Sequence, residues 1–328
     1  MIRLLHRDRA GNVRKDIPLG ELPRRLRQAG SLTWLDLAGE PPEVCEPILR
    51  EAFGFHPLAI DDALTETHVP KLDDWGDYLY LAIHAIHYDP AADPSLTTQE
   101  FDTFLGPNYL VTHHDDVLPG VDRVWERADR DERYMASGAD HLYYALADEI
   151  IFGYLHSVEA IDEDIEAFED AVFARPTPDT LEQVFSLKRG LLHLRRIVGP
   201  QREVFNKLAR DDLRVIDKKD RVYFRDVYDH LVRLHDINES MRDQVTGVLE
   251  IYLSVINNRM NEIMKTLALV TTIFMPISFL VGFFGMNYFA APITFQEWTE
   301  LPSFVVTMLV LILTPLAFYI WFRRRAWL

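Results

Sequence analysis

Two long runs without a charged side chain, both near the C-terminus, set the tightest limit on how this chain folds. The first run follows Lys265 and continues to Gly285, and the second extends from Leu301 to Phe322. Each is about 20 residues long, which is the length that a helix needs to cross the apolar core of a bilayer. We therefore predict two membrane-spanning helices, 265–286 and 301–322, after a large water-soluble part.

Charges around the two runs predict their orientation. Basic residues gather on the cytoplasmic side of membrane proteins, and here they precede the first run and follow the second: Arg259, Lys265, Arg323, Arg324 and Arg325. The first residues are basic and lack the apolar core of a signal peptide. We predict both termini in the cytoplasm, a loop 287–300 outside with Glu297 and Glu300, and a basic cytosolic tail 323–328 that forms a ring in an assembly.

Composition excludes several classes of protein. The formal net charge of −17 over 328 residues argues against nucleic-acid binding and favours attraction of cations. The single cysteine, Cys45, excludes an intramolecular disulfide and a multi-cysteine metal cluster. No phosphate-binding glycine loop, nucleophile motif or zinc-protease motif is present, so an enzyme is a distant alternative.

The soluble part has three sections. Residues 1–135 alternate strand and helix signals, which predicts an α/β layer. The predicted strands are Ile2–Leu5, Ser31–Leu37, Tyr78–His87, Glu100–Leu105 and Tyr109–His113. Residues 136–219 predict a helical hairpin with an acidic arm, a turn at Pro176 and Pro178, and a basic arm from Leu181. Residues 220–264 predict a stalk helix that continues into the first span.

That stalk and the first span carry an unusual stripe. As one helix, residues 220–285 would be about 95 Å long, a length that needs support from copies of itself. At helical spacing one face holds polar, thioether and small side chains without charge: Asn261, Met264, Leu267, Thr271, Met275 and Ser278. Polar positions of helices in lipid turn toward neighbouring helices or a water-filled lumen. Periodicity alone leaves an ordinary packing seam and a pore lining equally open.

The tripeptide Gly285-Met286-Asn287 at the mouth of the first span favours the pore. Mg²⁺ holds its water tightly and is usually bound with several waters retained. A ring of Asn amide oxygens, one per subunit, can hold a hydrated dication through its waters and still release it. Met264 and Leu267 further along would then form an apolar constriction that gates by dewetting, and Glu297 and Glu300 would either concentrate cations or only keep the loop soluble.

Several motifs together resemble the CorA family of magnesium and cobalt channels. The resemblance extends from Tyr223 to the C-terminus and is carried by these strings: Tyr223-Phe224-Arg225-Asp226-Val227-Tyr228-Asp229-His230, Asn261-Glu262-Ile263-Met264-Lys265, Thr272-Ile273-Phe274-Met275-Pro276 and Gly285-Met286-Asn287. It implies a homopentameric funnel, namely an α+β cytosolic domain with an α/β/α layer, a long helical stalk and two C-terminal transmembrane helices, of which the first lines the pore.

The resemblance also implies roles for single residues. Asn287 becomes the selectivity ring, with Gly285 and Met286 shaping its turn. Asp226 becomes a regulatory metal carboxylate between neighbouring funnels, with an N-terminal partner for which Asp89 is our choice and Asp93 the reserve. Bound cytosolic Mg²⁺ would hold the subunits closed, and its loss would let them splay.

The sequence departs from the family pattern after Asn287, where a Met-Pro-Glu-Leu stretch is usual and this chain reads Tyr288 to Glu300 with Ala290-Ala291-Pro292-Ile293. Zinc-transporting relatives share the Gly-Met-Asn string. We therefore predict a Mg²⁺ channel of a prokaryotic plasma membrane that also passes Co²⁺, with Ni²⁺ as a further candidate ion. Two alternatives stay open: a Zn²⁺ transporter, proton-coupled or not, and a non-conducting membrane-tethered sensor or scaffold.

Two other groups of residues are interpreted as structural. His113-His114-Asp115-Asp116 follows a predicted strand, and neighbouring residues of a strand point to opposite faces, so we expect a loop rather than a metal centre. The acidic segment from Glu159 to Asp170 is interpreted mainly as a solvated helix face. A role in attracting Mg²⁺ toward the funnel stays open.

Overall fold

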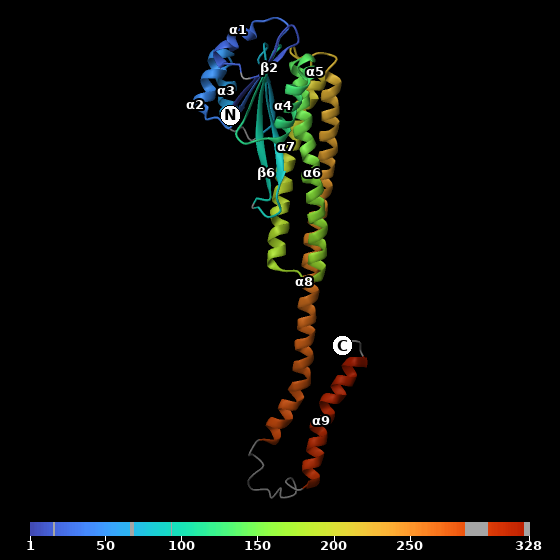
Figure 1. Cartoon of the computed structure of the whole chain (residues 1–328). Coiled ribbons are helices and arrows are strands. Elements are labelled where there is room, and N and C mark those ends of the chain that lie inside the picture. The colour runs from blue at the N-terminus through green and yellow to red at the C-terminus, as the bar shows by residue number, and fades with distance from the viewer. Residues whose placement is uncertain (16, 66–68, 93, 286–300, 325–328) are drawn as a thin grey trace. The chain divides into compact units, whose positions relative to one another are not determined.

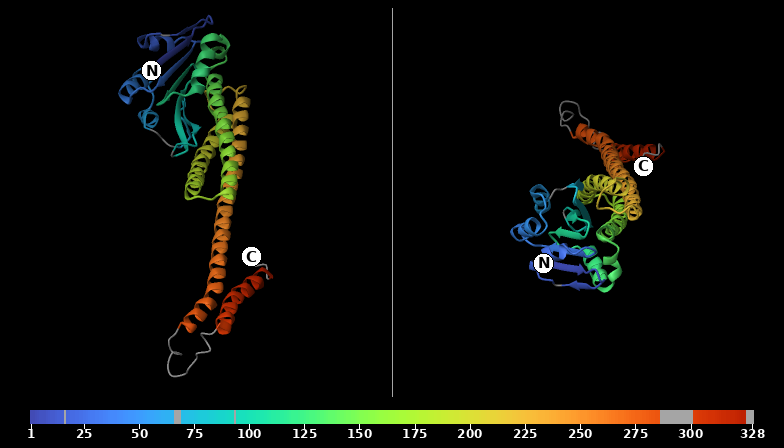
Figure 2. Two further views of the ribbon diagram at one scale, coloured as in Figure 1. Left: turned by 60° about the horizontal axis from the view of Figure 1, so that its bottom comes forward. Right: turned by 90° about the horizontal axis from the view of Figure 1, so that it is seen from above.

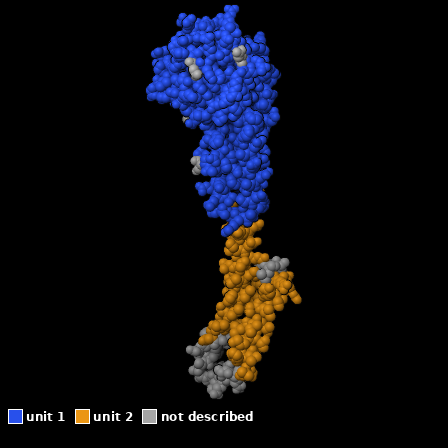
Figure 3. Space-filling model, in the orientation of Figure 1, with its two compact units in different colours: residues 1–250 blue, residues 251–328 orange. Residues whose placement is uncertain are grey.

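The computed structural model describes residues 1–15, 17–65, 69–92, 94–285 and 301–324. It divides into two compact units, Met1–Glu250 and Ile251–Leu328, which Figure 3 colours separately. The first unit holds a sheet and the helices that cover it. The second unit holds the C-terminal part of one long helix and a further helix.

A seven-stranded sheet forms the centre of the first unit, in the order β2-β1-β3-β7-β6-β5-β4. Only β3 and β7 pair in parallel, and every other neighbouring pair is antiparallel. The strands are β1 (Ile2–Arg7), β2 (Val13–Lys15), β3 (Leu32–Ala38), β4 (Lys71–Asp74), β5 (Leu79–Tyr88), β6 (Leu96–Leu105) and β7 (Tyr109–His114).

Helices cover both faces of this sheet (Figure 1). Leu35 and Leu37 of β3 face a core formed with α1 (Leu22–Leu26), α2 (Pro42–Pro47), η2 (Ile48–Ala52) and α3 (Pro57–Leu64). Cys45 lies fully buried in this core. On the opposite face, Trp34 packs against Trp125 of α4 (Pro119–Arg130), with ring centroids 4.8 Å apart and the ring planes tilted by 59°. Alternation along the strand thus supplies two apolar faces.

Two long helices, α6 (Ala139–Ala174) and α7 (Pro178–Arg210), pack on the second face after the short α5 (Glu132–Ala136). The views in Figure 2 show α6 and α7 side by side. Helix α7 begins three residues before its predicted start because Thr177 caps it: the Thr177 hydroxyl oxygen accepts from the Thr180 N–H at 3.2 Å. Pro178 at the first helical position needs no N–H partner.

Helix α8 spans Arg221–Phe284, 64 residues that belong to both units. Its first part is amphipathic, and Phe224 is fully buried between Tyr143 of α6 and Phe205 of α7, with ring centroids 6.1 and 6.5 Å away. A continuous helix of this length follows from the absence of proline before Pro276. The predicted stalk and first span are therefore one uninterrupted element among the described residues.

The predicted fold class is confirmed: an α/β layer, a long helix and two apolar C-terminal helices. Two strands were missed, β2 and β4, because each is short, lies at an edge and carries charged residues. The predicted strand Tyr109–His113 is confirmed, and the expectation of a loop after it is wrong for His114, which also belongs to β7. His113 and His114 are both buried, with Asp102 Oδ2 3.6 Å from His113 Nδ1 and Asp36 Oδ1 3.3 Å from His114 Nε2.

Candidate functional site

The second unit offers two helices that are long and apolar enough to cross a membrane. These are the C-terminal part of α8 and α9 (Leu301–Arg324), and neither apolar window is buried inside the chain. A core helix would be buried, and a signal sequence would lie near the N-terminus. An apolar surface of this length facing water is unfavourable, so lipid or further copies of the chain must cover it.

All six residues of the predicted stripe lie on α8 with exposed side chains. At 100° per residue they fall within an arc of about 120°, so they share one face. Met264 is 59% exposed and Met275 is 71% exposed. The Thr271 hydroxyl donates to the Leu267 carbonyl at 2.9 Å, which satisfies this polar group within its own helix. The face is thus free of charge and available for association.

Helix α8 ends directly before the Met286-Asn287 pair. The Gly285 N–H donates to the Val281 carbonyl at 2.9 Å, and a Cβ at residue 285 would lie only 2.9 Å from the same oxygen. Glycine is therefore required for this close backbone approach. Met286, Asn287, Glu297, Glu300 and Arg325 lie outside the described residues. Arg323 and Arg324 form the last turn of α9, where positive charge complements the helix dipole.

In the first unit, Asp226 is exposed on α8. Its field reaches Asp148 of α6: burial raises the pKa of Asp148, His230 lowers it, and Asp226 raises it further. Asp148 and Asp226 also both raise the pKa of Tyr144, whose largest cause is burial. Two carboxylates that repel each other next to a histidine can share a cation. Sequence reasoning missed Asp148 because the two helices are distant in sequence.

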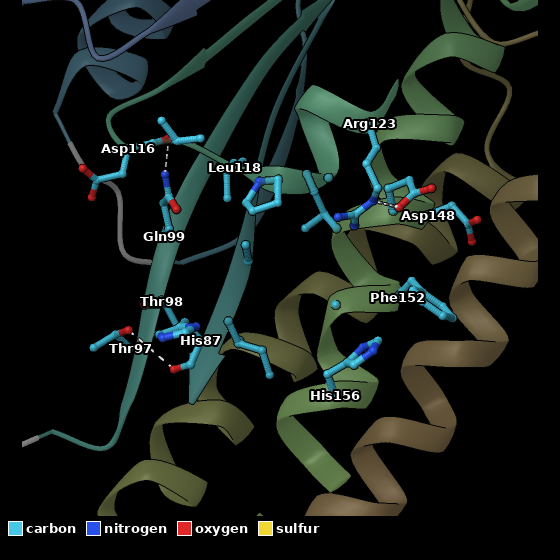
Figure 4. Close-up of a pocket in the computed structure, with 18 of the residues that line it drawn as sticks. His87, Thr97, Thr98, Gln99, Asp116, Leu118, Arg123, Asp148, Phe152 and His156 are labelled. Carbon is cyan, nitrogen blue, oxygen red and sulfur yellow. Dashed lines mark hydrogen bonds and ion pairs between the residues drawn. The ribbon is translucent and has the colours of Figure 1, made fainter. Parts of the chain in front are cut away.

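Asp148 borders a cavity of about 1210 Å³ between the sheet and the helices α4 and α6 (Figure 4). The adjacent Glu149 is held by two arginines, with Arg123 Nε at 2.9 Å and Arg127 Nη1 at 2.6 Å from its carboxylate oxygens. Among the described residues no ion pair neutralises Asp148. The free carboxylate is therefore Asp148 rather than its neighbour.

The structure does not bring Asp89 to Asp226 within the described part of one chain. Asp89 follows β5 in the turn toward β6: its Oδ1 accepts from the Ala91 N–H at 2.9 Å, and its own N–H donates to Ser95 O at 2.8 Å. These bonds give Asp89 a structural role in the turn. Asp93 lies outside the described residues. A contact of Asp89 with a second copy stays a prediction.

A second acidic group lies where α6 begins. The ligand-type oxygens of Asp140, Asp217 and Asp220 are all within 4.8 Å of one another. Asp140 Oδ2 accepts from the Asp217 N–H at 2.9 Å, and Lys219 Nζ lies 3.3 Å from Asp217 and 3.7 Å from Asp220. Lys219 offsets part of the negative charge and the Asp217 N–H satisfies one oxygen of Asp140, so these contacts tie the connection between α7 and α8 to the start of α6.

The chain matches the model of one protein family, described as the CorA-like Mg²⁺ transporter protein family, over residues 29–324. It is 32% identical to the cobalt/magnesium transport protein CorA of Thermotoga maritima over 304 residues, 92% of this chain and 85% of the relative. It is 26% identical to the zinc transport protein ZntB of Yersinia pseudotuberculosis over 90% of this chain and 88% of the relative.

A solved structure shares the whole fold. The CorA magnesium transporter from Methanocaldococcus jannaschii superposes with a TM-score of 0.84 at 23% identity, covering 99% of this chain and 98% of that one. The relatives named here are transport proteins rather than enzymes. The family match over most of the chain and the membrane-length helices agree, so this chain belongs to the CorA-like Mg²⁺ transporter protein family.

Proposed function

We propose that this protein is a divalent cation transporter of the channel type, which carries Mg²⁺, and Co²⁺ as a second ion, across the membrane. The observation that carries the proposal is the charge-free stripe on α8, which leads along an apolar helix to Gly285 and the Met286-Asn287 pair. This arrangement offers amide and carbonyl oxygens to a passing cation but no fixed charge.

A path without charge suits an ion that keeps its water. Stripping the hydration shell from Mg²⁺ is unfavourable, and amide oxygens bind its waters without trapping it. We propose that Asn287 supplies these oxygens at the entrance and that Met264 and Leu267 form the apolar constriction. Thr271 and Ser278 lie between the two, where their oxygens can contact the hydration shell.

The stripe becomes a lumen only in an oligomer. Apolar side chains of α8 such as Phe274 and Phe279, 59% and 70% exposed, need lipid or a partner helix, while Asn261 needs water or a polar partner. A ring of copies with the stripe inward satisfies both demands. We propose a homopentamer, with α9 outside the ring and both termini in the cytoplasm of a prokaryotic cell.

We further propose that cytosolic Mg²⁺ closes the channel. Asp226 is exposed, is electrostatically linked to Asp148, and lies on the helix that continues into the pore. Without a cation the two carboxylates repel each other, and bound Mg²⁺ removes that repulsion. Subunits joined through this site would be held in one arrangement, and loss of Mg²⁺ would shift the population toward an open one.

Zn²⁺ is the second candidate ion, because the chain is also similar to a protein named for zinc transport. Flux through purified protein in vesicles separates the candidates. Mg²⁺, Co²⁺, Ni²⁺ and Zn²⁺ are offered singly, with and without a pH gradient. Uptake of Mg²⁺ and Co²⁺ that does not depend on the gradient supports the proposal. Uptake of Zn²⁺ alone contradicts it, and absence of all flux favours a sensor or scaffold.

A further inference from the structure

Three adjacent strands in the middle of the sheet carry four side chains of the metal-ligand type. Glu100 and Asp102 stand two residues apart on β6, so they share one face. The register pairs Glu100 with His84 of β5 and Asp102 with His113 of β7. Directly opposite residues have neighbouring side chains, so the four form a contiguous row across the strands.

The row is buried and closely spaced. The exposed fractions of these side chains are 0% for His84, 7% for Glu100, 4% for Asp102 and 6% for His113. Asp102 Oδ2 lies 3.6 Å from His113 Nδ1, and Glu100 Oε2 lies 3.6 Å from His84 Nε2. Two ligands of one tetrahedral zinc ion lie about 3.3 Å apart when each bond is about 2.0–2.1 Å. The spacing between Asp102 Oδ2 and His113 Nδ1, which both belong to the ligand set proposed below, is close to that value.

Three of these residues face one cavity. Glu100, Asp102 and His113 line a space of about 180 Å³, together with Asp115 and Asp116 at the end of β7. Nδ1 of His113 is buried and has no hydrogen-bond partner among the residues that the structure describes. A buried polar atom without a partner is unfavourable, and here it borders a cavity that carboxylates line. That is the setting in which a cation completes the bonding.

Neighbouring side chains hold the carboxylates in place. The Tyr80 hydroxyl donates to Asp102 Oδ1 at 2.6 Å, which leaves Oδ2 for the ligand position toward His113. Glu100 forms a hydrogen bond with Asp102 and lies beside His84. Such outer contacts orient the ligands of metal sites. Tyr80 is itself fully buried, so its position is fixed by packing.

We propose that Glu100, Asp102 and His113 form a binding site for one transition-metal dication of the Zn²⁺ and Co²⁺ class, with Tyr80 and His84 as positioning residues. A mixed set of imidazole nitrogen and carboxylate oxygen favours these ions over Mg²⁺, which prefers oxygen alone. The site belongs to the α/β layer and uses none of the residues proposed for the pore or for the regulatory site at Asp226. It therefore does not depend on the proposed transport function.

The test uses the full-length protein in detergent, freed of metal with a chelator and kept in millimolar Mg²⁺ to occupy oxygen-only sites. Co²⁺ is titrated, and visible absorption and bound metal per chain are measured. We expect one Co²⁺ per chain with the intense absorption of a four-coordinate ion. His113→Gln and Asp102→Asn should each weaken binding by at least roughly 10- to 100-fold, the loss typical even of outer-shell changes.

Control variants separate this site from the other acidic groups. Asp226→Asn and Asp140→Asn should leave the Co²⁺ spectrum and stoichiometry unchanged. Asp102→Asn keeps the shape of the protonated acid and an oxygen for the Tyr80 hydroxyl, so it tests the site even if His113→Gln fails to fold. Unchanged Co²⁺ binding in Asp102→Asn, or only the spectrum of hydrated Co²⁺ in the wild-type protein, would overturn the proposal.

Discussion

His114 Nε2 lies 3.3 Å from Asp36 Oδ1 in the interior of the sheet, where both side chains are almost fully buried. Asp36 also accepts from Arg3 Nη2 at 2.6 Å and from the Thr112 hydroxyl at 2.6 Å. Strands β1, β3 and β7 thus meet at one carboxylate. This network stabilises the interior of the sheet, where β1, β3 and β7 lie side by side.

The pair predicts a dependence of stability on pH. Burial alone would lower the pKa of His114, but Asp36 raises it above the ordinary 6.5. Burial alone would raise the pKa of Asp36, but His114, Thr112 and Arg3 lower it below 3.8. The His114 contribution is complete below 6.5 and is lost as the pH rises through its raised pKa. The Asp36 contribution is complete above 3.8 and is lost as the pH falls through its lowered pKa.

We therefore expect this pair to stabilise most between about pH 4 and pH 6.5. With a chelator present to remove bound metal, His114→Gln should lower the free energy of unfolding by about 1–3 kcal/mol near pH 6 and by less at alkaline pH. Denaturant unfolding at several pH values measures it. A loss that is equal at all these pH values would show that only packing changed.

Phe224 predicts how strongly α8 is held in the first unit. Phe224→Ala removes a fully buried ring between α6 and α7 and should lower the free energy of unfolding by about 3–5 kcal/mol. Val222→Ala, two residues away and 63% exposed, should change it by less than about 0.5 kcal/mol. Equal effects of the two substitutions in denaturant unfolding would contradict the packing described.

Gly285 predicts a backbone requirement at the end of the first span. In Gly285→Ala the new Cβ would lie 2.9 Å from the Val281 carbonyl oxygen, so the end of α8 must shift. We expect Mg²⁺ flux to fall by about tenfold or more, because raising the free-energy barrier to ion passage by only about 1.4 kcal/mol slows it tenfold. At Gly247, on the same helix but before the charge-free run, a Cβ meets nothing within 4 Å, and Gly247→Ala should keep nearly full flux. Similar flux in both variants would contradict a requirement for glycine at residue 285.

Asp226 and Asp148 predict the regulation. Asp226→Asn and Asp148→Asn should each raise the cytosolic Mg²⁺ concentration that half-closes the channel by several-fold, because each removes one charge from the shared site. Asp229→Asn, at an exposed position on the same helix, is the matched control and should leave inhibition unchanged. Patch recordings over a range of internal Mg²⁺ measure the shift, and inhibition like wild type in both site variants would count against it.

Local patterns in the sequence were sufficient for most of the architecture. Charge-free runs predicted the apolar helices. Strand signals predicted five strands, and the structure has a strand at each of the five places. Strands β2 and β4 had no such signal, because edge strands this short and charged bury little. The predicted start of α7 was three residues too late because the prediction did not consider Thr177 as the helix cap.

The sites depended on contacts between distant residues. Asp148 reaches Asp226 only because α6 packs along α8, and the row from His84 to His113 exists only through the register of three strands. Neither contact could be predicted from a residue spacing in a single sequence. The expectation that the tetrad His113-His114-Asp115-Asp116 forms no metal centre considered only neighbours along one strand. It did not consider the partner strand β6, where Asp102 lies beside His113.

Mg²⁺ flux in the wild-type protein and in Asn287→Ala tests the central claim most directly. Wild-type protein and Asn287→Ala are reconstituted in vesicles at equal density, and Mg²⁺ entry is followed with an enclosed indicator, with cobalt hexammine added as a mimic of the hydrated ion. We predict Mg²⁺ entry in the wild type that hexammine blocks, and its loss in Asn287→Ala with the oligomer intact. Undiminished Mg²⁺ entry through an intact Asn287→Ala oligomer would contradict a filter made by this amide.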